Sequence, residues 1–352
     1  MSDQRDHGAS PLTSRRRFGA TGLAVCPIVL GTMQFGWTLS SVESMRVLDR
    51  YRELGGNVVD TADMYGGDQS VESFRHNRAH VGTSEEIIGR WLETRSCRDE
   101  FVLDTKVRAR MWDGPDGEGL GRAHVTRAVE DSLRRLRTDT LDILWAHWPE
   151  PGDDLVEFLS VAADLIAAGK VRFLGTSNFC DFAGNGDRLS PMLQLAAADA
   201  GLPSVAAEQP RYNLLNRAEY ETTLQALTLR HDLGIMTYSS LASGFLAGAA
   251  TPDDTAGSDA RERQLSRYRT PAGWELLDRI TAIAATHGTT RSAVALAWTL
   301  AQPGVTATII GPQAIGELED AAPAATLTLD RHELDMLTAA SWWASEPEFV
   351  VW

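Results

Sequence analysis

The chain has 352 residues, of which 43% are hydrophobic, and a formal net charge of -15 at pH 7. This length can bury a large core, either in two ordinary domains or in one α/β barrel. The acidic balance argues against nucleic acid or an anionic membrane surface as a partner, and no apolar run approaches the roughly 20 residues that cross a bilayer. The three cysteines, Cys26, Cys97 and Cys180, are scattered, which favours a reducing compartment with neither a disulfide framework nor a metal site.

Residues 1–14 are polar and lack periodicity, so we expect a flexible tail. The following Ser14-Arg-Arg-Arg-Phe18 resembles a twin-arginine export signal, but glycines and a proline interrupt the apolar run behind it. We therefore expect the protein to be cytoplasmic. Residues 17–31 predict a short hairpin that turns at Gly22.

From residue 40 onward, helical and strand-like patterns alternate. Ser40 and Glu43 are spaced as a capping box before a helix that ends at Gly55-Gly56, and Thr83 and Glu86 predict a second capping box. Further helices are expected at residues 124–136, 155–168, 219–230, 274–287 and 291–301. Strands are expected at residues 57–60, 101–106, 141–147, 171–178, 204–209, 234–238, 306–311 and 325–329.

This alternation predicts right-handed crossovers and a parallel sheet. About eight strands fit a closed (β/α)8 TIM barrel better than an open sheet. We expect the barrel to span residues 15–340, with an N-terminal hairpin, and a C-terminal tail at 341–352 to pack near it. The long segments 66–82, 107–122 and 242–270 all follow strands, so they are expected at the carboxyl-end face, where active sites of this fold lie.

Three successive predicted strands deliver reactive side chains to that face. The first ends at Asp60 with Tyr65 just beyond it, the second ends at Lys106 and the third at His147. Alone, each has an ordinary structural explanation, such as a turn-forming aspartate or a packed tyrosine. Together they favour a site, and Lys106 is one of only two lysines in the chain, the other being Lys170.

The chemistry of this set is specific. A phenol has a pKa near 10, and an adjacent ammonium favours its phenolate, while a carboxylate can hold the ammonium in place. A histidine on the other side can donate a hydrogen bond to the oxygen that the phenol protonates. These residues therefore predict a site for charge that develops on a carbonyl oxygen.

The same segments resemble the aldo-keto reductase family from about Arg17 to Leu337. The motifs that carry the resemblance are Asn57-Val-Val-Asp-Thr-Ala-Asp-Met-Tyr-Gly66, Asp104-Thr-Lys106, Asp142-Ile-Leu-Trp-Ala-His147, Gly175-Thr-Ser-Asn-Phe179, Glu208-Gln-Pro-Arg-Tyr-Asn213, Tyr238-Ser-Ser-Leu241 and Ile310-Gly311. The family implies a barrel that binds extended NAD(P)H without a Rossmann domain. In agreement, no Gly-x-Gly-x-x-Gly follows a strand.

The resemblance implies a role for each matched residue. Tyr65 is the general acid, Lys106 and Asp60 lower its pKa, and His147 orients the carbonyl group. The implied cofactor residues are Asp60, with Ser177, Asn178 and Gln209 at the nicotinamide carboxamide, Tyr238 stacked on the nicotinamide ring, Gly31, Thr32 and Met33 beside its ribose, and Ser239, Leu241, Ser243 and Leu246 along the pyrophosphate.

The adenosine end departs from the family pattern. After Gly311 the family often carries a residue that reads the phosphate of NADP, whereas this chain has Gln313, followed by Glu317 and Ala321. We assign Gly311, Gln313 and Glu317 to the adenosine end and leave the cofactor open between NADP and NAD. Arginines in the long loop, such as Arg261 or Arg263, could still supply a phosphate contact.

Four aromatic residues, Trp37, Trp112, Trp148 and Tyr212, are expected at the barrel mouth, either as substrate walls or as lid packing. The segment 66–83 is longer than we expect for the family and could bind a polar or anionic substrate through Arg75, His76, Asn77, Arg78 and His80. The tail at 341–352 carries three tryptophans and could cover the pocket or a partner subunit.

The predicted function is reduction of an aldehyde or ketone, possibly a sugar or natural-product intermediate, by NAD(P)H. One alternative is NAD-dependent oxidation of an alcohol or sugar at the same site. Another is a regulatory subunit that binds nucleotide without turnover, like the potassium-channel beta subunits that resemble this family. The expected partner is a small carbonyl compound, with neither nucleic acid nor membrane, and the chain could form a homo-oligomer.

Overall fold

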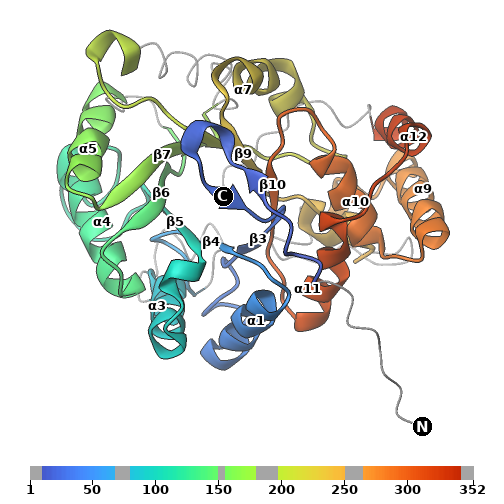
Figure 1. The fold of residues 1–352 in the computed structure, drawn as a ribbon, viewed down its shortest axis with the longest axis horizontal. Helices are drawn as coiled ribbons and strands as arrows, with labels where there is room; N and C mark the ends of the chain where they lie inside the picture. Colours follow the sequence, from blue (N-terminus) through green and yellow to red (C-terminus); the bar gives the residue numbers. More distant parts are fainter. Residues whose placement is uncertain (1–9, 68–79, 150–154, 180–196, 250–264, 342–352) are drawn as a thin grey trace.

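The structure is a computed structural model that describes residues 10–67, 80–149, 155–179, 197–249 and 265–341. Its centre is a closed barrel of parallel strands, in which β10 pairs with β3 to complete the ring (Figure 1). The barrel strands are β3 (Ile28–Gly31), β4 (Val58–Asp60), β5 (Val102–Val107), β6 (Leu141–Ala146), β7 (Val171–Ser177), β8 (Ala207–Gln209), β9 (Gly234–Thr237) and β10 (Ala307–Ile310). The prediction of a (β/α)8 TIM barrel is confirmed.

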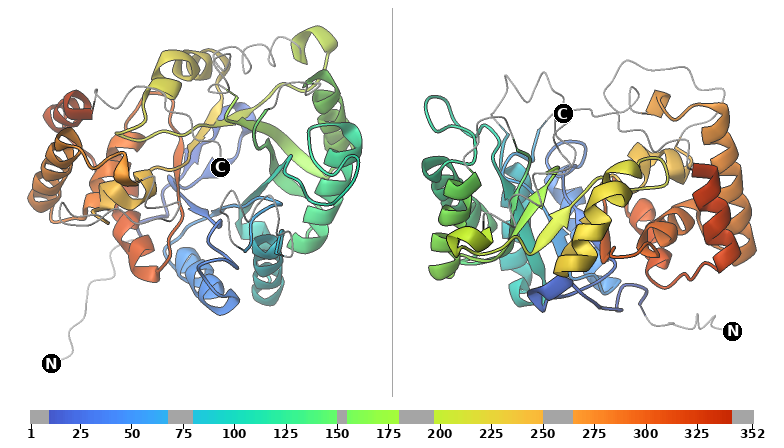
Figure 2. Two further views of the ribbon diagram at one scale, coloured as in Figure 1. Left: turned by 180° about the vertical axis from the view of Figure 1, so that it is seen from behind. Right: turned by 90° about the horizontal axis from the view of Figure 1, so that it is seen from above.

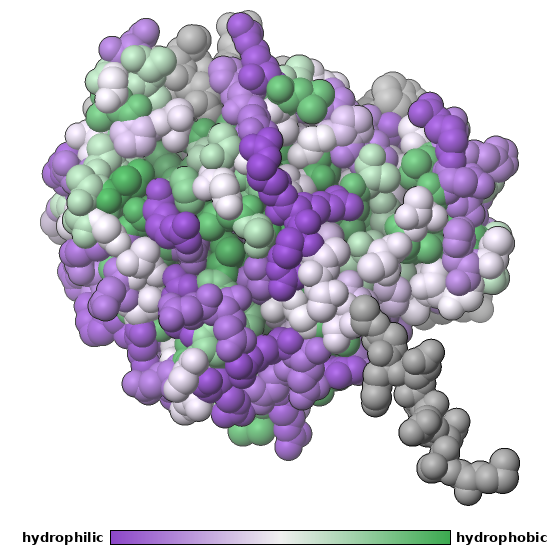
Figure 3. All heavy atoms as spheres, in the orientation of Figure 1, coloured by the Kyte–Doolittle hydropathy of each residue, from purple (hydrophilic) through white to green (hydrophobic). Residues whose placement is uncertain are grey.

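Helices surround the barrel on its outer side (Figures 1 and 2). They are α1 (Ser41–Glu53), α3 (Thr83–Arg95), α4 (Arg122–Leu136), α5 (Leu155–Ala167), a π-helical turn (Tyr220–Leu224) with α7 (Gln225–His231), α9 (Pro271–His287), α10 (Arg291–Leu300), α11 (Ile315–Ala321) and α12 (Arg331–Ser341). The helices at the lower edge of Figure 3, α1 and α3, present mainly hydrophilic side chains outward. No described helix combines the length and the apolar character needed to cross a membrane.

The barrel strands form because both of their faces are covered. Every residue of β5 and of β6 is buried, and β6 is accordingly apolar at every position except Asp142. Asp104 and Lys106 in β5 interrupt its run at spacing two, so both point to the same side of the strand. Two ionisable side chains on one buried face of a strand indicate a functional site.

The N-terminal hairpin is confirmed, but it is shorter than predicted. β1 (Arg16–Arg17) pairs with β2 (Ala24–Val25), and Gly22 turns the chain at a φ of +75°. The hairpin packs against the amino end of β9, where the Ala20 N–H donates to Asp232 O at 2.8 Å. Residues 28–31, which we predicted to belong to this hairpin, form the first barrel strand instead.

Two other predictions were wrong. Residues 325–329 are not a strand, because the chain there leaves a 3-10 turn (Ala322–Ala325) that contains Pro323. Short apolar runs do not distinguish a barrel strand from a hairpin arm or a buried turn, which explains both this error and that at 28–31. Residues 10–14, which we assigned to the flexible tail, are packed: Leu12 is fully buried and its N–H donates to Leu54 O at 3.0 Å.

The two predicted capping boxes differ in outcome. In the first, Ser40 Oγ accepts the N–H of Glu43, and the Glu43 carboxylate accepts the N–H of Ser40 at 2.9 Å. The second is absent, because α3 starts at Thr83 itself, after Gly82 in a left-handed conformation, with no side-chain cap. Only α1 is therefore held by a cap of this kind among these two helices.

Replacement of Ser40 by alanine should lower the free energy of unfolding by about 0.5–2 kcal/mol, because it removes the cap of α1. Thr83→Ala is the comparison variant and should cost less, because Thr83 accepts no N–H of its helix and its hydroxyl only donates one hydrogen bond, to His80 O. Denaturant unfolding at equilibrium measures both values. Equal losses for the two variants would contradict the assignment of the cap.

Candidate active site

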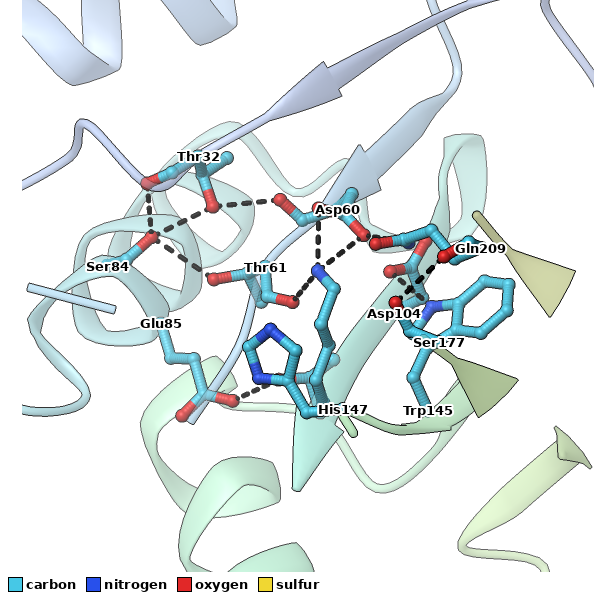
Figure 4. Close-up of polar contacts among 12 residues, drawn as sticks. Thr32, Asp60, Thr61, Ser84, Glu85, Asp104, Trp145, His147, Ser177 and Gln209 are labelled. Atoms are coloured by element: carbon cyan, nitrogen blue, oxygen red, sulfur yellow. Dashed lines mark hydrogen bonds and ion pairs between the residues drawn. The ribbon is translucent and has the colours of Figure 1, made fainter. Parts of the chain in front are cut away.

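The carboxyl ends of β4 and β5 meet in a buried ion pair (Figure 4). Lys106, which is 1% exposed, donates from Nζ to the two carboxyl oxygens of Asp60 at 2.7 and 2.8 Å, and to Thr61 O at 2.8 Å. These acceptors match the three hydrogens of the ammonium group. The lysine is therefore locked in one position.

Tyr65 and His147 lie against this pair. The ring centroid of Tyr65 is 5.1 Å from Lys106 Nζ and 6.0 Å from the ring of His147, which it meets edge-on. Both rings are half-buried. The fold thus brings all four predicted catalytic side chains together, and their individual roles stay predictions.

Charge is distributed unequally over this group. Burial would lower the pKa of Lys106, but the Asp60 carboxylate, 2.7 Å from Nζ, contributes most to raising it and the net shift is upward, so the ammonium persists at neutral pH. Burial raises the pKa of Tyr65, and Lys106 offsets this only in part. Lys106 thus acts on Tyr65 in the expected direction, while desolvation of the phenol, which the sequence analysis did not consider, acts against it. Tyr65 holds its proton at neutral pH.

His147 is neutral. Burial lowers the pKa of its imidazole well below the usual range, and the charges of Lys106 and Arg108 lower it further. Its Nδ1 atom is buried and has no hydrogen-bond partner in the part of the chain that the structure describes. A proton on Nδ1 would leave a buried donor unpaired, so we assign the proton to Nε2, where it can be donated to a ligand.

Asp104 is a site residue to which the sequence analysis assigned no role. Its Oδ1 accepts the indole N–H of Trp145 at 2.8 Å, and burial followed by the charge of Asp60 raises its pKa well above the usual range. Burial and the charge of Asp60 therefore disfavour a second carboxylate beside Lys106. Its spacing of two from Lys106 in a strand was the signal that could have found it.

The predicted nicotinamide residues lie across the barrel from β4, at the ends of β7, β8 and β9. Gln209 Nε2 donates to Asp60 Oδ1 at 2.8 Å, and Ser177 Oγ donates to Gln209 O at 2.8 Å. Asn178 Nδ2 donates to His147 O at 3.0 Å, and its Oδ1 accepts from Tyr238 Oη at 2.7 Å. These amides and hydroxyls fit a carboxamide group, and they are continuous with the ion pair.

On the opposite side, the first turn of α3 anchors the segment that carries Tyr65. Ser84, fully buried, donates its N–H to Tyr65 O at 3.1 Å. Its Oγ lies 2.9 Å from Thr32 Oγ1 and 3.1 Å from Thr61 Oγ1, and Thr32 Oγ1 donates to Asp60 O at 2.9 Å (Figure 4). One serine therefore ties together the backbone around Asp60 and Tyr65, and no sequence pattern pointed to it.

The Aldo/keto reductase family model matches residues 27–341. The chain belongs to this family. It is 32% identical to the uncharacterized oxidoreductase YrpG of Bacillus subtilis, over 91% of this chain and 93% of that protein. It is 31% identical to a putative voltage-gated potassium channel subunit beta of Schizosaccharomyces pombe, over 84% and 83% of the two chains. It is 28% identical to an L-glyceraldehyde 3-phosphate reductase of Escherichia coli O157:H7, over 91% and 90%.

As an aldo-keto reductase the protein is an NAD(P)-dependent oxidoreductase. Three further residues that we predicted to bind the cofactor lie at and after the end of β3. Gly31 pairs with Asp60 between β3 and β4, and a Cβ there would lie 2.6 Å from Ile309, so glycine is required. Thr32 is fully buried, whereas Met33 is half-buried beside it.

The loop after β9 has a strained backbone. Ser239, Ala242 and Ser243 have positive φ angles of 54°, 49° and 58°. Non-glycine residues seldom adopt this conformation, and where they do, they concentrate in functional loops. The Leu246 side chain is fully buried in the hydrophobic core, and its assignment to the segment along the pyrophosphate stays a prediction. Leu241 is half-buried and packs against that core.

The turn that we predicted to lie at the adenosine end of the cofactor carries an acidic side chain. The exposed Glu317 accepts the backbone N–H of Gln313 at 2.7 Å, just before α11, and Gly311 is exposed next to this turn. Arg261 and Arg263 lie outside the described residues, as do Arg75, His76, Asn77, Arg78 and the tail from residue 342. His80 is described, and its carbonyl oxygen accepts from Thr83 Oγ1 at 2.7 Å.

The four predicted substrate aromatics separate into different environments. Trp148 lies at the site, with its ring centroid 4.6 Å from that of His147. Trp112 stacks on His124 at 4.9 Å in α4, which is lid packing, and Trp37 is 38% exposed. The prediction for Tyr212 is wrong: it is fully buried and donates its hydroxyl to Glu221 at 2.7 Å, because the chain turns inward after β8.

A second buried charge cluster lies behind the catalytic segment. Glu85 accepts from Arg135 Nε and from Thr105 Oγ1, both at 2.7 Å. Asp63 is fully buried, and neither of its carboxyl oxygens has a hydrogen-bond partner among the described residues. Burial, and then the charge of Glu85, raises the pKa of Asp63 well above the usual range. Folding therefore disfavours the ionised form of Asp63.

An acid whose pKa is raised by folding stabilises the folded state below its unfolded pKa of about 4 and loses that contribution as pH rises. Asp63→Asn keeps the shape without the ionisation. We expect its Tm to exceed that of the wild type at pH 7 by roughly 2–4 °C and the difference to shrink toward pH 4. Thermal unfolding between pH 4 and pH 8 measures this.

Asp49 provides a control whose contribution to stability depends on pH with the opposite sign. Arg95 lowers the pKa of Asp49, so Asp49 stabilises the protein above its unfolded pKa and loses this contribution as pH falls. Asp49→Asn should therefore lower Tm at pH 7. A lower Tm at pH 7 for Asp63→Asn as well would show that Asp63 is needed in its ionised form.

Proposed function

We propose that the protein reduces an aldehyde or ketone to the alcohol, with Tyr65 as the proton donor. The observation that carries this proposal is the buried Lys106–Asp60 pair, with Nζ 5.1 Å from the ring of a protonated Tyr65. His147, beside Tyr65, is neutral, so it can donate a hydrogen bond to a carbonyl oxygen without carrying a positive charge. Such a site polarises a carbonyl oxygen and then protonates it.

NAD(P)H supplies a hydride to the carbonyl carbon when it is bound. The residues suited to hold its nicotinamide are Ser177, Asn178, Gln209 and Tyr238. As negative charge develops on the carbonyl oxygen, His147 Nε2 donates a hydrogen bond to it and Tyr65 Oη transfers its proton. The phenolate that remains is stabilised by the Lys106 ammonium, whose charge Asp60 holds in place.

The same residues catalyse the reverse reaction, in which a Tyr65 phenolate accepts the proton of an alcohol. Higher pH and excess oxidised cofactor favour that direction. A regulatory role is the second candidate, supported by the 31% identity to the potassium channel subunit beta of S. pombe. The complete set of Asp60, Tyr65, Lys106 and His147 favours turnover, because a sensor needs no proton donor.

Replacement of Tyr65 by phenylalanine should reduce kcat by about 10²–10⁴-fold, because it removes the proton while keeping the ring. The dissociation constant of NADPH or NADH, measured by fluorescence quenching, should change less than threefold. Tyr220→Phe is the matched control, since its hydroxyl donates to Pro303 O, remote from the site, and its kcat should stay near wild type. Turnover that survives in Tyr65→Phe would contradict the proposal.

We also propose that the cofactor is NADH rather than NADPH. The Glu317 carboxylate already accepts the N–H of Gln313 and brings negative charge to the turn where the adenosine phosphate of NADP would lie. Repulsion between exposed charges a few ångströms apart amounts to roughly 1 kcal/mol, or several-fold in affinity.

Fluorescence titration should therefore give a lower dissociation constant for NADH than for NADPH. Glu317→Gln should reduce severalfold the ratio of the dissociation constant of NADPH to that of NADH. Glu319→Gln, the same charge change on α11 at a residue that pairs with Arg50, should leave it unchanged. Tighter binding of NADPH to the wild type would contradict the preference without affecting the catalytic proposal.

A further inference from the structure

The first turn of α3 binds the segment that carries the proposed proton donor. The N–H groups at the start of a helix have no partner within the helix, and α3 begins at Thr83 without a side-chain cap. Ser84 donates its free N–H to Tyr65 O at 3.1 Å, and the Tyr65 N–H donates to Ala62 O at 3.1 Å. The backbone of Tyr65 is therefore held on both sides, and the bond from Ser84 is the one that links it to a helix.

The side chain of the same serine belongs to a buried chain of hydroxyl groups (Figure 4). Ser84 Oγ donates toward Thr32 O and Thr32 Oγ1, at 3.0 and 2.9 Å, and lies 3.1 Å from Thr61 Oγ1. Thr32 in turn donates both its N–H and its hydroxyl to Asp60 O, at 3.0 and 2.9 Å. Ser84, Thr32 and Thr61 are all fully buried, so no solvent competes for these bonds.

The direction of the protons in this chain is fixed. A hydroxyl group has one proton, and that of Ser84 is directed at Thr32, so the Thr61 hydroxyl donates to Ser84 Oγ. Among the described residues, Ser84 is the hydrogen-bond partner of the Thr61 hydroxyl. Loss of the serine oxygen would leave that buried donor unpaired, which costs free energy unless the turn moves.

The chain of hydroxyl groups ends at the ion pair. Lys106 Nζ donates to Thr61 O at 2.8 Å as well as to the Asp60 carboxylate. Thr61 thus contacts Lys106 through its carbonyl group and Ser84 through its hydroxyl. Ser84 therefore reaches both halves of the site: its N–H holds the backbone of Tyr65, and its hydroxyl holds the residues that fix the ammonium.

The start of α3 is fastened to the barrel by the next residue too. Glu85 is fully buried and accepts from Thr105 Oγ1 in β5 and from Arg135 Nε in α4, both at 2.7 Å. Ser84 binds Thr32 and Thr61, which directly follow β3 and β4. Two consecutive residues of α3 thus connect it to three neighbouring strands, and this gives the turn that holds Tyr65 a defined place relative to Lys106.

We propose that Ser84 is a positioning residue for the proton donor. By joining the ends of β3 and β4 to the carbonyl group of Tyr65, it sets the distance of the Tyr65 hydroxyl from Lys106 and from the carbonyl group of the substrate. This inference rests on the proposed function, and it adds a residue that acts on the reaction only through Tyr65.

Ser84→Ala removes the hydroxyl and keeps the N–H. In the reduction of 4-nitrobenzaldehyde, kcat should fall about tenfold, because a displacement of a fraction of an ångström misaligns the proton transfer. KM and the dissociation constant of the cofactor should stay near wild type. The solvent deuterium isotope effect on kcat should increase, since proton transfer from Tyr65 then limits turnover more strongly. Ser84→Cys should restore part of kcat, because a thiol is a weak donor of similar size.

Two further variants separate positioning from a general loss of stability. Ser44→Ala is the matched control: Ser44 is also fully buried, near the start of α1, where its hydroxyl donates to Ser40 O at 2.8 Å. Its kcat and isotope effect should equal those of the wild type. Thr61→Val removes the donor to Ser84 and keeps the shape. Combined with Ser84→Ala, it should give a kcat no lower than that of Ser84→Ala alone, because both changes break the same hydrogen bond.

A wild-type kcat in Ser84→Ala would overturn the role of Ser84, as would an equal loss in Ser44→Ala. Crystal structures test the position independently of turnover. The distance from Lys106 Nζ to the ring centroid of Tyr65, 5.1 Å in the wild type, should lengthen in Ser84→Ala, and an unchanged distance would overturn the inference. Absence of turnover by the wild type across a broad panel of carbonyl compounds would instead contradict the proposed reduction.

Discussion

The site depends on the ion pair between Lys106 and Asp60. Both groups are almost fully buried, at 1% and 3% exposure, and removing two charges from water costs more than their attraction commonly returns. Such a pair adds little to the stability of the barrel. Its value lies in holding one positive charge at a fixed place beneath Tyr65, which no exposed lysine could do.

The neighbouring groups keep that charge effective. Burial raises the pKa values of Asp104 and Tyr65 and lowers that of His147, so each of these three groups favours its uncharged form beside the ion pair of Lys106 and Asp60. A second ionised carboxylate next to Lys106 would cancel its influence on the phenol. Burial therefore acts twice: it raises the pKa of the phenol, and it suppresses the competing charge of Asp104.

The four reactive residues are held in position by side chains from other elements of the fold. Gln209 reaches Asp60 from β8, and Ser84 reaches Tyr65, Thr61 and Thr32 from the first turn of α3. The loop that carries Tyr65 is thus fastened to a rigid helix, which suits a proton donor that must keep its distance from a carbonyl oxygen.

The sequence by itself determined the barrel, the first capping box and the positions of Asp60, Tyr65, Lys106 and His147, because alternation of helices and strands and the reactive ends of strands are local patterns. Only the tertiary structure decided that residues 28–31 complete the barrel, that Tyr212 and Leu246 face the core, and that burial raises the pKa values of Asp63 and Asp104. It also decided the direction of the pKa of Tyr65. Burial and charge interactions depend on distances between segments far apart in the chain, and no local pattern contains those distances.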